Sequence, residues 1–267
     1  MLLDAVLMCH APIVIPHIAK ARQSSCALST QGMRRAAQKV TAQNPDLILI
    51  VSPHAPRWED GFGIVPSASS GDFGRFGEPS IRVSAPTDVS LCASIREHAN
   101  RVGLACRDVN VQTLDHGSAV PLFFIQETQW RKNVIICTIP YPSQIQSCVH
   151  FGSSIASLMS EKGVRWSLVA SGDMSHALSK DAPCGFHPSG ERFDAHFVDA
   201  IAHGDYEKAL YGEECLRREA AEDVVDSVAV AFGALSHAGQ TDGRRPPCEI
   251  YSYEGPFGVG YTTAHLI

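Results

Sequence analysis

Two histidines follow apolar segments of the chain, and each is followed by Ala-Pro. His10 comes directly after Leu2 to Cys9, and His54 follows Asp46 to Ser52 within Ser-Pro-His-Ala-Pro. Histidine is the commonest protein ligand of transition metals, and a neighbouring proline restricts the backbone that carries it. A single histidine in such a place is more often an ordinary polar loop residue. The repeated His-Ala-Pro context favours one metal site that contains both His10 and His54.

Two further histidines could move protons beside this site. His176 ends the segment Gly-Asp-Met-Ser-His, and His116 lies in Leu-Asp-His-Gly just before an apolar stretch. Free imidazole titrates near neutral pH, so it can accept a proton and return it. Asp173 could fix a neighbouring imidazole or cap the next turn. His116 could bind a substrate oxygen at a helix N-terminus or act as a cap itself.

A carboxylate would complete the set of two histidines and one carboxylate that holds non-haem Fe(II). The C-terminal segment offers Glu249 and Glu254. Glu254 is the better candidate because it ends a predicted strand beside Gly255, although a lone glutamate there is more often a solvated charge. We therefore predict that His10, His54 and Glu254 bind a mononuclear metal ion.

The elements that must position these residues alternate between strands and helices. Apolar runs predict strands at 2–9, 46–52, 80–83, 105–109, 133–139, 166–171, 249–253 and 259–265. Helical patterns cover 30–43, 86–101, 119–127, 144–162 and, in two or three pieces, 191–239. Residues 11–29 read as a loop, and residues 61–77 read as an irregular loop or a hairpin. This order predicts an α/β fold, a single domain over 1–267 with a mainly parallel central sheet flanked by helices. His10, His54 and His176 then follow strand ends, where such sheets bind ligands.

The composition of the chain excludes several classes of function. Its 267 residues carry a net charge of -6, which argues against a nucleic-acid partner. No apolar stretch is long enough to cross a membrane, and the N-terminal segment lacks the features of a signal peptide. Nine scattered cysteines without a Cys-x-x-Cys pair favour a cytoplasmic protein with reduced thiols. The chain has no P-loop, no His-Glu-x-x-His and no Gly-x-Ser-x-Gly, so nucleotide, metalloprotease and serine-hydrolase motifs are all missing.

Five motifs in this order resemble the type III extradiol ring-cleavage dioxygenases, the superfamily of the protocatechuate 4,5-dioxygenase catalytic subunit. They are His10-Ala-Pro, Ser52-Pro-His-Ala, Leu114-Asp-His-Gly, Gly172-Asp-Met-Ser-His and Tyr253-Glu-Gly. The resemblance extends from residue 6 to residue 261, and each motif is weak alone. Residues 171–190 and 252–261 look most like the Memo and AmmeMemoRadiSam relatives. Those relatives often carry a second domain, which is not expected here because the chain ends six residues after Tyr261.

The resemblance implies a role for each candidate residue. His10, His54 and Glu254 match the metal ligands, His176 matches the acid/base histidine, and His116 matches a second pocket histidine that orients substrate and oxygen. The implied cofactor is Fe(II), with Zn(II) or Mn(II) as alternatives. The implied reaction partners are a small catechol-like aromatic substrate and O2, and the implied assembly is a homodimer or a complex with a small second subunit.

Two other functions stay open at the level of sequence. Memo-type relatives keep the fold without clear dioxygenase activity, so a metal-binding protein without oxygen chemistry is one alternative. A Zn(II)-dependent hydrolase that uses a metal-bound water is the other.

Overall fold

The computed structural model describes residues 1–237 and 246–266. Ten strands are present in these ranges, namely β1 Leu2–Met8, β2 Leu47–Ser52, β3 Phe62–Ile64, β4 Ser69–Phe73, β5 Glu78–Ala85, β6 Cys106–Asp108, β7 Asn133–Thr138, β8 Trp166–Ser171, β9 Glu249–Glu254 and β10 Tyr261–His265. The α-helices are α1 Pro16–Ala19, α2 Ala27–Thr41, α3 Val89–Arg101, α4 His116–Glu127, α5 Ile145–Glu161, α6 Pro188–Ala202, α7 Tyr206–Tyr211, α8 Glu214–Ala220 and α9 Val225–His237. Short 3-10 turns lie at Pro12–Val14, Lys20–Cys26 and Gly74–Phe76.

Eight of the strands form one central sheet in the order β6-β3-β7-β2-β8-β1-β10-β9. The middle of the sheet is parallel, because β7, β2, β8 and β1 all run in one direction. The edges are mixed, since β3 pairs antiparallel with β7 and the hairpin β9–β10 pairs antiparallel with β1. The predicted α/β fold with a mainly parallel sheet is therefore confirmed.

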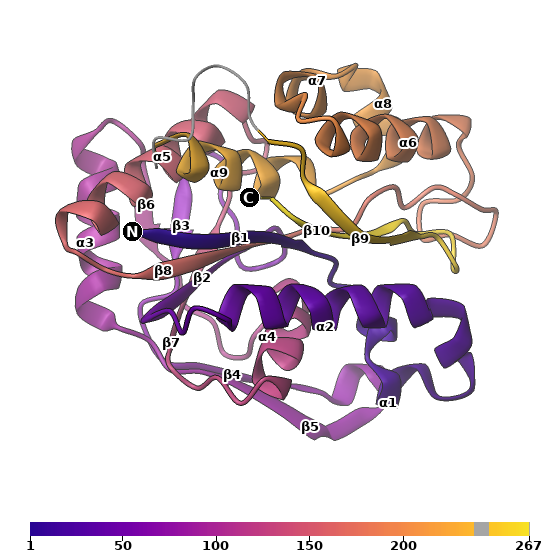
Figure 1. The fold of residues 1–267 in the computed structure, drawn as a ribbon, viewed down its shortest axis with the longest axis horizontal. Coiled ribbons are helices and arrows are strands. Elements are labelled where there is room, and N and C mark those ends of the chain that lie inside the picture. The colour runs from indigo at the N-terminus through magenta and orange to yellow at the C-terminus, as the bar shows by residue number, and fades with distance from the viewer. Residues whose placement is uncertain (238–245, 267) are drawn as a thin grey trace.

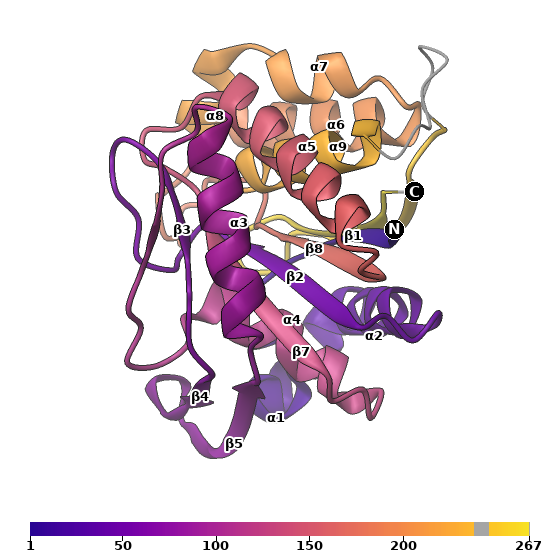
Figure 2. The ribbon, with the colours of Figure 1, turned by 90° about the vertical axis from the view of Figure 1, so that its left-hand side faces the viewer.

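Helices cover both faces of the sheet (Figures 1 and 2). Alternate residues of one strand enter different cores, as expected for a strand buried on both sides. In β2, Ile48 and Ile50 pack with α2 and α4, whereas Leu49 and Val51 pack with α5 and α9. Helices α6, α7 and α8 form an additional group on the α9 side of the sheet (Figure 1). The chain between α8 and α9 is thereby brought to the carboxyl ends of the parallel strands.

The structure departs from the predicted elements in two regions. A loop was predicted for residues 11–29, but they contain two 3-10 turns, α1 and the start of α2. Residues 61–77, predicted as an irregular loop or a hairpin, contain β4, which forms a hairpin with β5 in a separate two-stranded sheet, and β3, which joins the central sheet and was not predicted. These strands are short, and β4 is rich in Ser and Gly, so neither shows the apolar run that marks a strand. Residues 238 and 239 of the predicted helical region lie outside the described ranges.

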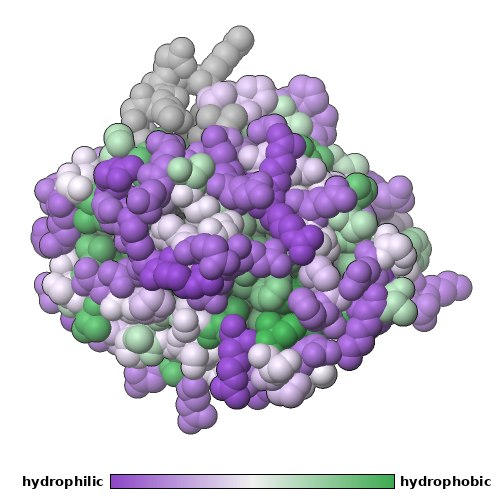
Figure 3. All heavy atoms as spheres, turned by 60° about the horizontal axis from the view of Figure 1, so that its bottom comes forward, coloured by the Kyte–Doolittle hydropathy of each residue, from purple (hydrophilic) through white to green (hydrophobic). Residues whose placement is uncertain are grey.

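Free thiols and a largely polar face characterise the described part of the chain. Within the described ranges all nine cysteines are free, and most of them are buried. No described helix is both long and apolar enough to span a bilayer. The face brought forward in Figure 3 is largely hydrophilic, and its apolar residues gather in small patches.

Candidate metal centre

The residues predicted to form the site follow the carboxyl ends of three adjacent parallel strands. His10 follows β1, His54 follows β2, and the segment from Asp173 to His176 follows β8, which lies between the other two strands. The strands end level with one another, since Met8 pairs with Ser171 in the parallel register. The carboxyl ends of these strands therefore place His10 and His54 on opposite sides of the β8 loop.

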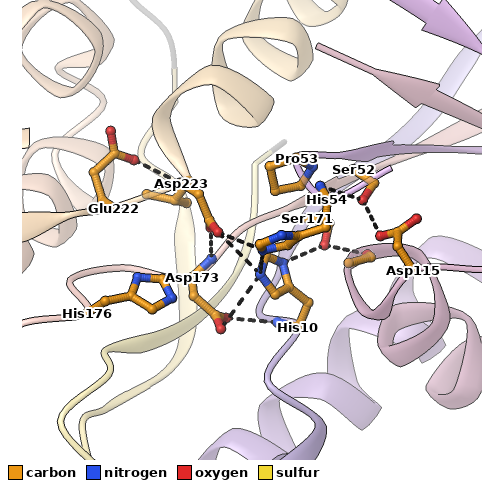
Figure 4. A network of polar contacts seen from close by, with 12 residues as sticks. His10, Ser52, Pro53, His54, Asp115, Ser171, Asp173, His176, Glu222 and Asp223 are labelled. Carbon is orange, nitrogen blue, oxygen red and sulfur yellow. Dashed lines mark hydrogen bonds and ion pairs between the residues drawn. The ribbon is translucent and has the colours of Figure 1, made fainter. Parts of the chain in front are cut away.

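The two histidines meet a carboxylate that belongs to the turn between α8 and α9. His54 Nε2 lies 3.0 Å from His10 Nε2 and 3.0 Å from Asp223 Oδ2. His10 Nε2 lies 3.5 Å from the same Asp223 oxygen. Figure 4 shows these three side chains pointing toward one another. Two imidazole nitrogens and one carboxylate oxygen thus share a small triangle.

The orientation of His10 is set by hydrogen bonds behind it. The Ser171 hydroxyl donates to the Gly117 carbonyl at 2.6 Å, so its oxygen is left to accept from His10 Nδ1 at 3.0 Å. The backbone N–H of His10 donates to Asp173 Oδ1 at 2.8 Å. With Nδ1 committed to Ser171, the Nε2 atom faces the triangle. A partner of this kind is typical of a metal-binding histidine, because it fixes the tautomer and the ring.

The triangle has the dimensions of three neighbouring ligands of one metal ion. Donor atoms about 2.1 Å from an octahedral ion lie about 3.0 Å apart when they are adjacent. The distances of 3.0, 3.0 and 3.5 Å match this requirement. Two imidazoles and a carboxylate are also the donor set of mononuclear iron sites with open positions. The residues present therefore fit a divalent transition-metal ion.

The charges around His10 favour a cation in the same place. Burial alone would lower the pKa of His10, but Asp173 and Asp223 outweigh it and raise this pKa to about 9. The carboxyl of Asp223 has a pKa well below its usual range because the charges on His10 and His54 outweigh its own burial. Two buried carboxylates thus require a positive charge between them, and a metal ion can supply it in place of the proton.

The turn that carries Asp223 packs against the end of β8. Asp223 Oδ1 accepts from the backbone N–H of Asp173 at 2.7 Å, and the N–H of Asp223 donates to the Asp173 carbonyl at 3.2 Å. A Cβ atom on Gly172 would lie 2.4 Å from Val224 Cα. Only glycine permits this approach, so Gly172 lets the carboxylate reach the histidines.

His116 lies against the other histidines and begins α4. Its ring centroid is 4.1 Å from that of His54 and 5.3 Å from that of His10. Asp115 caps the helix by accepting from the N–H of Ser118 at 3.0 Å, and it also accepts from the Ser52 hydroxyl at 2.6 Å. Burial, together with the charges on His10 and His54, lowers the pKa of His116 to about 4. His116 is therefore a neutral imidazole at neutral pH.

His176 presents one free ring nitrogen to the same space. Its Nδ1 lies 2.8 Å from the Ala221 carbonyl oxygen, which can only accept, so Nδ1 carries the proton. The Nε2 atom is then the basic nitrogen. The four histidines and Asp173 line a cavity of about 580 Å³, whose remaining wall includes Pro12, Ile13 and Phe257. The cavity is large enough for a single aromatic ring with substituents.

Comparison with known proteins identifies the family. The family described as the catalytic LigB subunit of aromatic ring-opening dioxygenase matches residues 4–264. The chain belongs to the LigB family. Protein CA_C1420 of Clostridium acetobutylicum is 30% identical over 270 residues, which cover 97% of this chain. The match spans 56% of the length of that relative.

A solved structure supports the same fold for this LigB member. The crystal structure of uncharacterized protein JW3007 from Escherichia coli K12 aligns with a TM-score of 0.68. The alignment covers 98% of this chain and 99% of that chain at 18% sequence identity. At this identity the likeness concerns the fold alone.

Glu254 does not join the histidines in this LigB member. Its Oε1 atom accepts from the backbone N–H of Ser29 at 2.7 Å, in the first turn of α2. The side chain of Cys26, at the N-cap position of that helix, accepts no hydrogen bond from the helix amides, so Glu254 satisfies an amide that the helix leaves unpaired. We correct the predicted ligand set accordingly and assign the carboxylate position to Asp223 as a proposal.

Asp223 was missed because the break between α8 and α9 is not marked in the sequence. Residues 191–239 read as helical pieces of uncertain limits, and the turn contains no glycine or proline. Ala221 adopts a φ of 53°, a left-handed conformation that alanine rarely takes. The available signal was the pair Glu222-Asp223 just before an apolar helix, which is where acidic residues cap helices. Asp173 was predicted either to fix an imidazole or to cap a turn. Its Oδ1 atom accepts from the backbone N–H of His10, and its Oδ2 atom lies 3.7 Å from His10 Nε2.

Proposed function

We propose that this protein is an Fe(II)-dependent extradiol ring-cleavage dioxygenase that acts on a catechol-like diol with O2. The observation that carries the proposal is the triangle of His10 Nε2, His54 Nε2 and Asp223 Oδ2, with separations of 3.0, 3.0 and 3.5 Å. Membership in the LigB family supports the ring-opening reaction. The substrate class and the iron are proposals that rest on this geometry and on the family.

In this proposal His10, His54 and Asp223 hold the metal ion on one side and leave its other positions open toward the cavity. An Fe(II) ion in this place would acidify a diol hydroxyl and transfer electron density from the diol to O2. The burial of His10 and the hydrogen bond that its Nδ1 donates to Ser171 keep this proposed ligand in a fixed position before the substrate binds.

His176 is the residue that moves protons in this proposal. Its Nδ1–H is fixed on the Ala221 carbonyl, so Nε2 is free to accept the proton of a substrate hydroxyl. The same nitrogen returns the proton when the ring opens, as general acid–base catalysis requires. His116 stays neutral beside His54 and can donate or accept one hydrogen bond to a substrate oxygen or to O2. The apolar part of the cavity wall, which includes Ile13 and Phe257, offers a surface against which an aromatic ring can pack.

The test is oxygen consumption by protein that has been loaded with Fe(II) without air. A panel of catechols is added, air is admitted, and O2 uptake is measured together with the absorbance of a ring-opened product. We expect one O2 consumed per diol and a yellow product for at least one member of the panel. A filled iron site that consumes no O2 with any diol would contradict the proposal and would favour a metal-binding role of Memo type.

Asp223→Ala and Glu254→Gln form a matched pair for the same assay. Loss of Asp223 should abolish turnover, because one ligand of the ion is removed. Glu254→Gln should retain most of the activity, since glutamine can still accept the hydrogen bond from the Ser29 N–H. Full activity in Asp223→Ala together with loss of activity in Glu254→Gln would instead identify Glu254 as the ligand.

A zinc hydrolase is the second candidate, and one observation favours it. Within residues 1–237 and 246–266, the ligand atoms of His10, His54 and His116 all lie within 4.8 Å of one another. Three histidines with one open position form a common catalytic zinc site. Metal analysis of protein purified without added metal separates the two candidates, because redox-inert zinc cannot pass electrons to O2.

A further inference from the structure

The turn between α8 and α9 serves two parts of the proposed site at once. The Ala220 carbonyl accepts from the backbone N–H of His176 at 2.8 Å, and the Ala221 carbonyl accepts from its Nδ1 at 2.8 Å. Two residues later, Asp223 places its carboxylate between His10 and His54. The shape of this one turn therefore sets both the proposed metal ligand and the proposed base.

The side chain of Glu222 is hydrogen-bonded to the backbone of this turn. Its Oε2 atom accepts from the backbone N–H groups of Val224 at 2.8 Å and Val225 at 2.9 Å, which are among the first amides of α9. Its Oε1 atom accepts from Arg217 Nε at 2.6 Å. Only 2% of the Glu222 side chain is exposed. Such a buried, charge-assisted arrangement is rigid, because each oxygen of the carboxylate has a fixed partner.

The backbone of the turn needs this support. Ala221 has a φ of 53°, which is unfavourable for a residue with a Cβ atom. The amides that Glu222 satisfies lie three and four residues after Ala221, so their hydrogen bonds stabilise the strained conformation. Without them the turn would relax, and the Ala221 carbonyl and the Asp223 carboxylate would move together.

We propose that Glu222, anchored by Arg217, is a positioning residue that fixes both the Asp223 carboxylate and the tautomer of His176. The part that concerns Asp223 rests on the proposed function, whereas the part that concerns His176 does not need a metal ion. The chain itself offers a matched control. Asp226 also binds Arg217, at 3.0 Å from its Nη2 atom, but its side chain accepts no hydrogen bond from the turn amides that Glu222 caps.

The first experiment compares Zn(II) affinity in the full chain by competition with a chromophoric chelator. The variants are Glu222→Gln and Asp226→Asn, which each remove one negative charge from the same arginine. Glutamine has a single acceptor oxygen, so its NH2 group would face either Arg217 Nε or the two turn amides, all of which are donors, and both sets of hydrogen bonds cannot be kept. Changes to residues that orient metal ligands typically weaken metal binding by about 10- to 100-fold. We expect a loss of at least about tenfold for Glu222→Gln, and a change of less than about twofold for Asp226→Asn, since the latter leaves the ligands in place.

The second experiment reads the tautomer of His176 by NMR of protein labelled with ¹⁵N-histidine, in the presence of a chelator. The wild-type protein and Asp226→Asn should both show the Nδ1–H form of this residue. Glu222→Gln should show a mixture of the two tautomers, because the Ala221 carbonyl is no longer held in place. A role that is only structural would lower the melting temperature of both variants alike without changing the tautomer of the folded protein.

The double variant Arg217→Met/Glu222→Leu covers the case in which Glu222→Gln fails to fold. Replacement of a buried ion pair by apolar residues often preserves stability. This variant still lacks the acceptor for the amides of Val224 and Val225, so it should lose both the metal affinity and the single tautomer. Wild-type affinity together with a single Nδ1–H tautomer in either Glu222 variant would overturn the inference. Absence of metal binding by the wild-type protein would instead overturn the proposed function, and the tautomer comparison would still decide the role of Glu222.

Discussion

At the scale of single residues, the proposed metal site consists of one carboxylate and its two imidazole neighbours. Asp223 completes the proposed ligand set of His10 and His54, since its Oδ2 atom lies 3.0 Å from His54 Nε2. Removal of either negative charge beside His10 would also remove part of the attraction for a cation.

Asp223→Asn should weaken metal binding far more than it weakens the fold. Asparagine keeps the size of the side chain and one oxygen, but it carries no charge to offset that of the metal ion. We expect a loss in Fe(II) or Zn(II) affinity of at least about 100-fold, on the order of 3 kcal/mol. Isothermal titration calorimetry measures this loss, and Glu254→Gln is the control. An affinity within about threefold of the wild-type value would remove Asp223 from the site.

The metal-free protein should lose stability as the pH rises from about 6.5 to about 9. The pKa of His10 is raised to about 9 in the folded protein, from an ordinary value of 6.5. The folded state therefore binds the proton more tightly, and this contribution is complete below pH 6.5 and lost as the pH passes about 9. Urea unfolding in the presence of a chelator should show a decrease of a few kcal/mol for the wild-type protein. The His10→Gln variant should not show this decrease. If the free energy of unfolding falls equally with pH in the two proteins, His10 is not the group responsible.

At this scale the sequence predicted the histidines better than the acids. His10, His54, His116 and His176 all line one cavity, as their positions after strands or before a helix suggested. Glu254 was chosen because it ends a strand, yet its carboxylate binds the first turn of α2 instead. A carboxylate suits a helix N-terminus and a metal site equally well, so position after a strand cannot distinguish the two.

At the scale of elements, the site is built from the ends of β1, β2 and β8 together with the α8–α9 turn. The three strands could be predicted from their apolar runs, and their parallel order places their ends side by side. The turn could not be predicted, because its unusual backbone lies at alanine rather than at glycine. The close approach of the turn to β8 depends instead on Gly172, where a Cβ atom would lie 2.4 Å from Val224 Cα.

Gly172→Ala tests the contact between these two elements. The new methyl group would lie 2.4 Å from Val224 Cα, so the turn must move away from β8. Overpacking of this kind typically costs about 1–3 kcal/mol of folding stability. We expect a lower melting temperature and a weaker metal site in the same variant. Gly103→Ala, at a site with no neighbour within 4 Å but a φ of +85°, is a control in which stability falls while metal affinity stays unchanged.

At the scale of the whole molecule, the fold joins residues that are far apart in the chain. The central sheet is formed from the beginning, the middle and the end of the sequence, and the proposed ligands come from positions 10, 54 and 223. Periodicity and apolar runs predict the order of layers, whereas the packing of the α6–α8 group against the sheet depends on long-range contacts. The fold class could therefore be predicted from the sequence, whereas the proposed third ligand, Asp223, could not.

Metal binding should stabilise the whole fold, since the ligands meet only in the folded chain. A ligand at 100 times its dissociation constant adds about 2.7 kcal/mol to the free energy of unfolding. Thermal unfolding with and without Zn(II) should show a melting temperature that rises with metal concentration. His54→Ala should remove the increase, whereas an increase that persists in this variant would place the metal elsewhere.

The proposal that His10, His54 and Asp223 bind the metal ion is tested most directly by the position of the metal in a crystal grown with Fe(II) under anaerobic conditions. Anomalous diffraction on either side of the iron absorption edge locates the ion independently of any assumption about its ligands. We predict a single strong peak about 2.0–2.2 Å from His10 Nε2, His54 Nε2 and an oxygen of Asp223. A metal ion that is bound by Glu254, or one that Asp223 does not contact, would contradict the proposed ligand set.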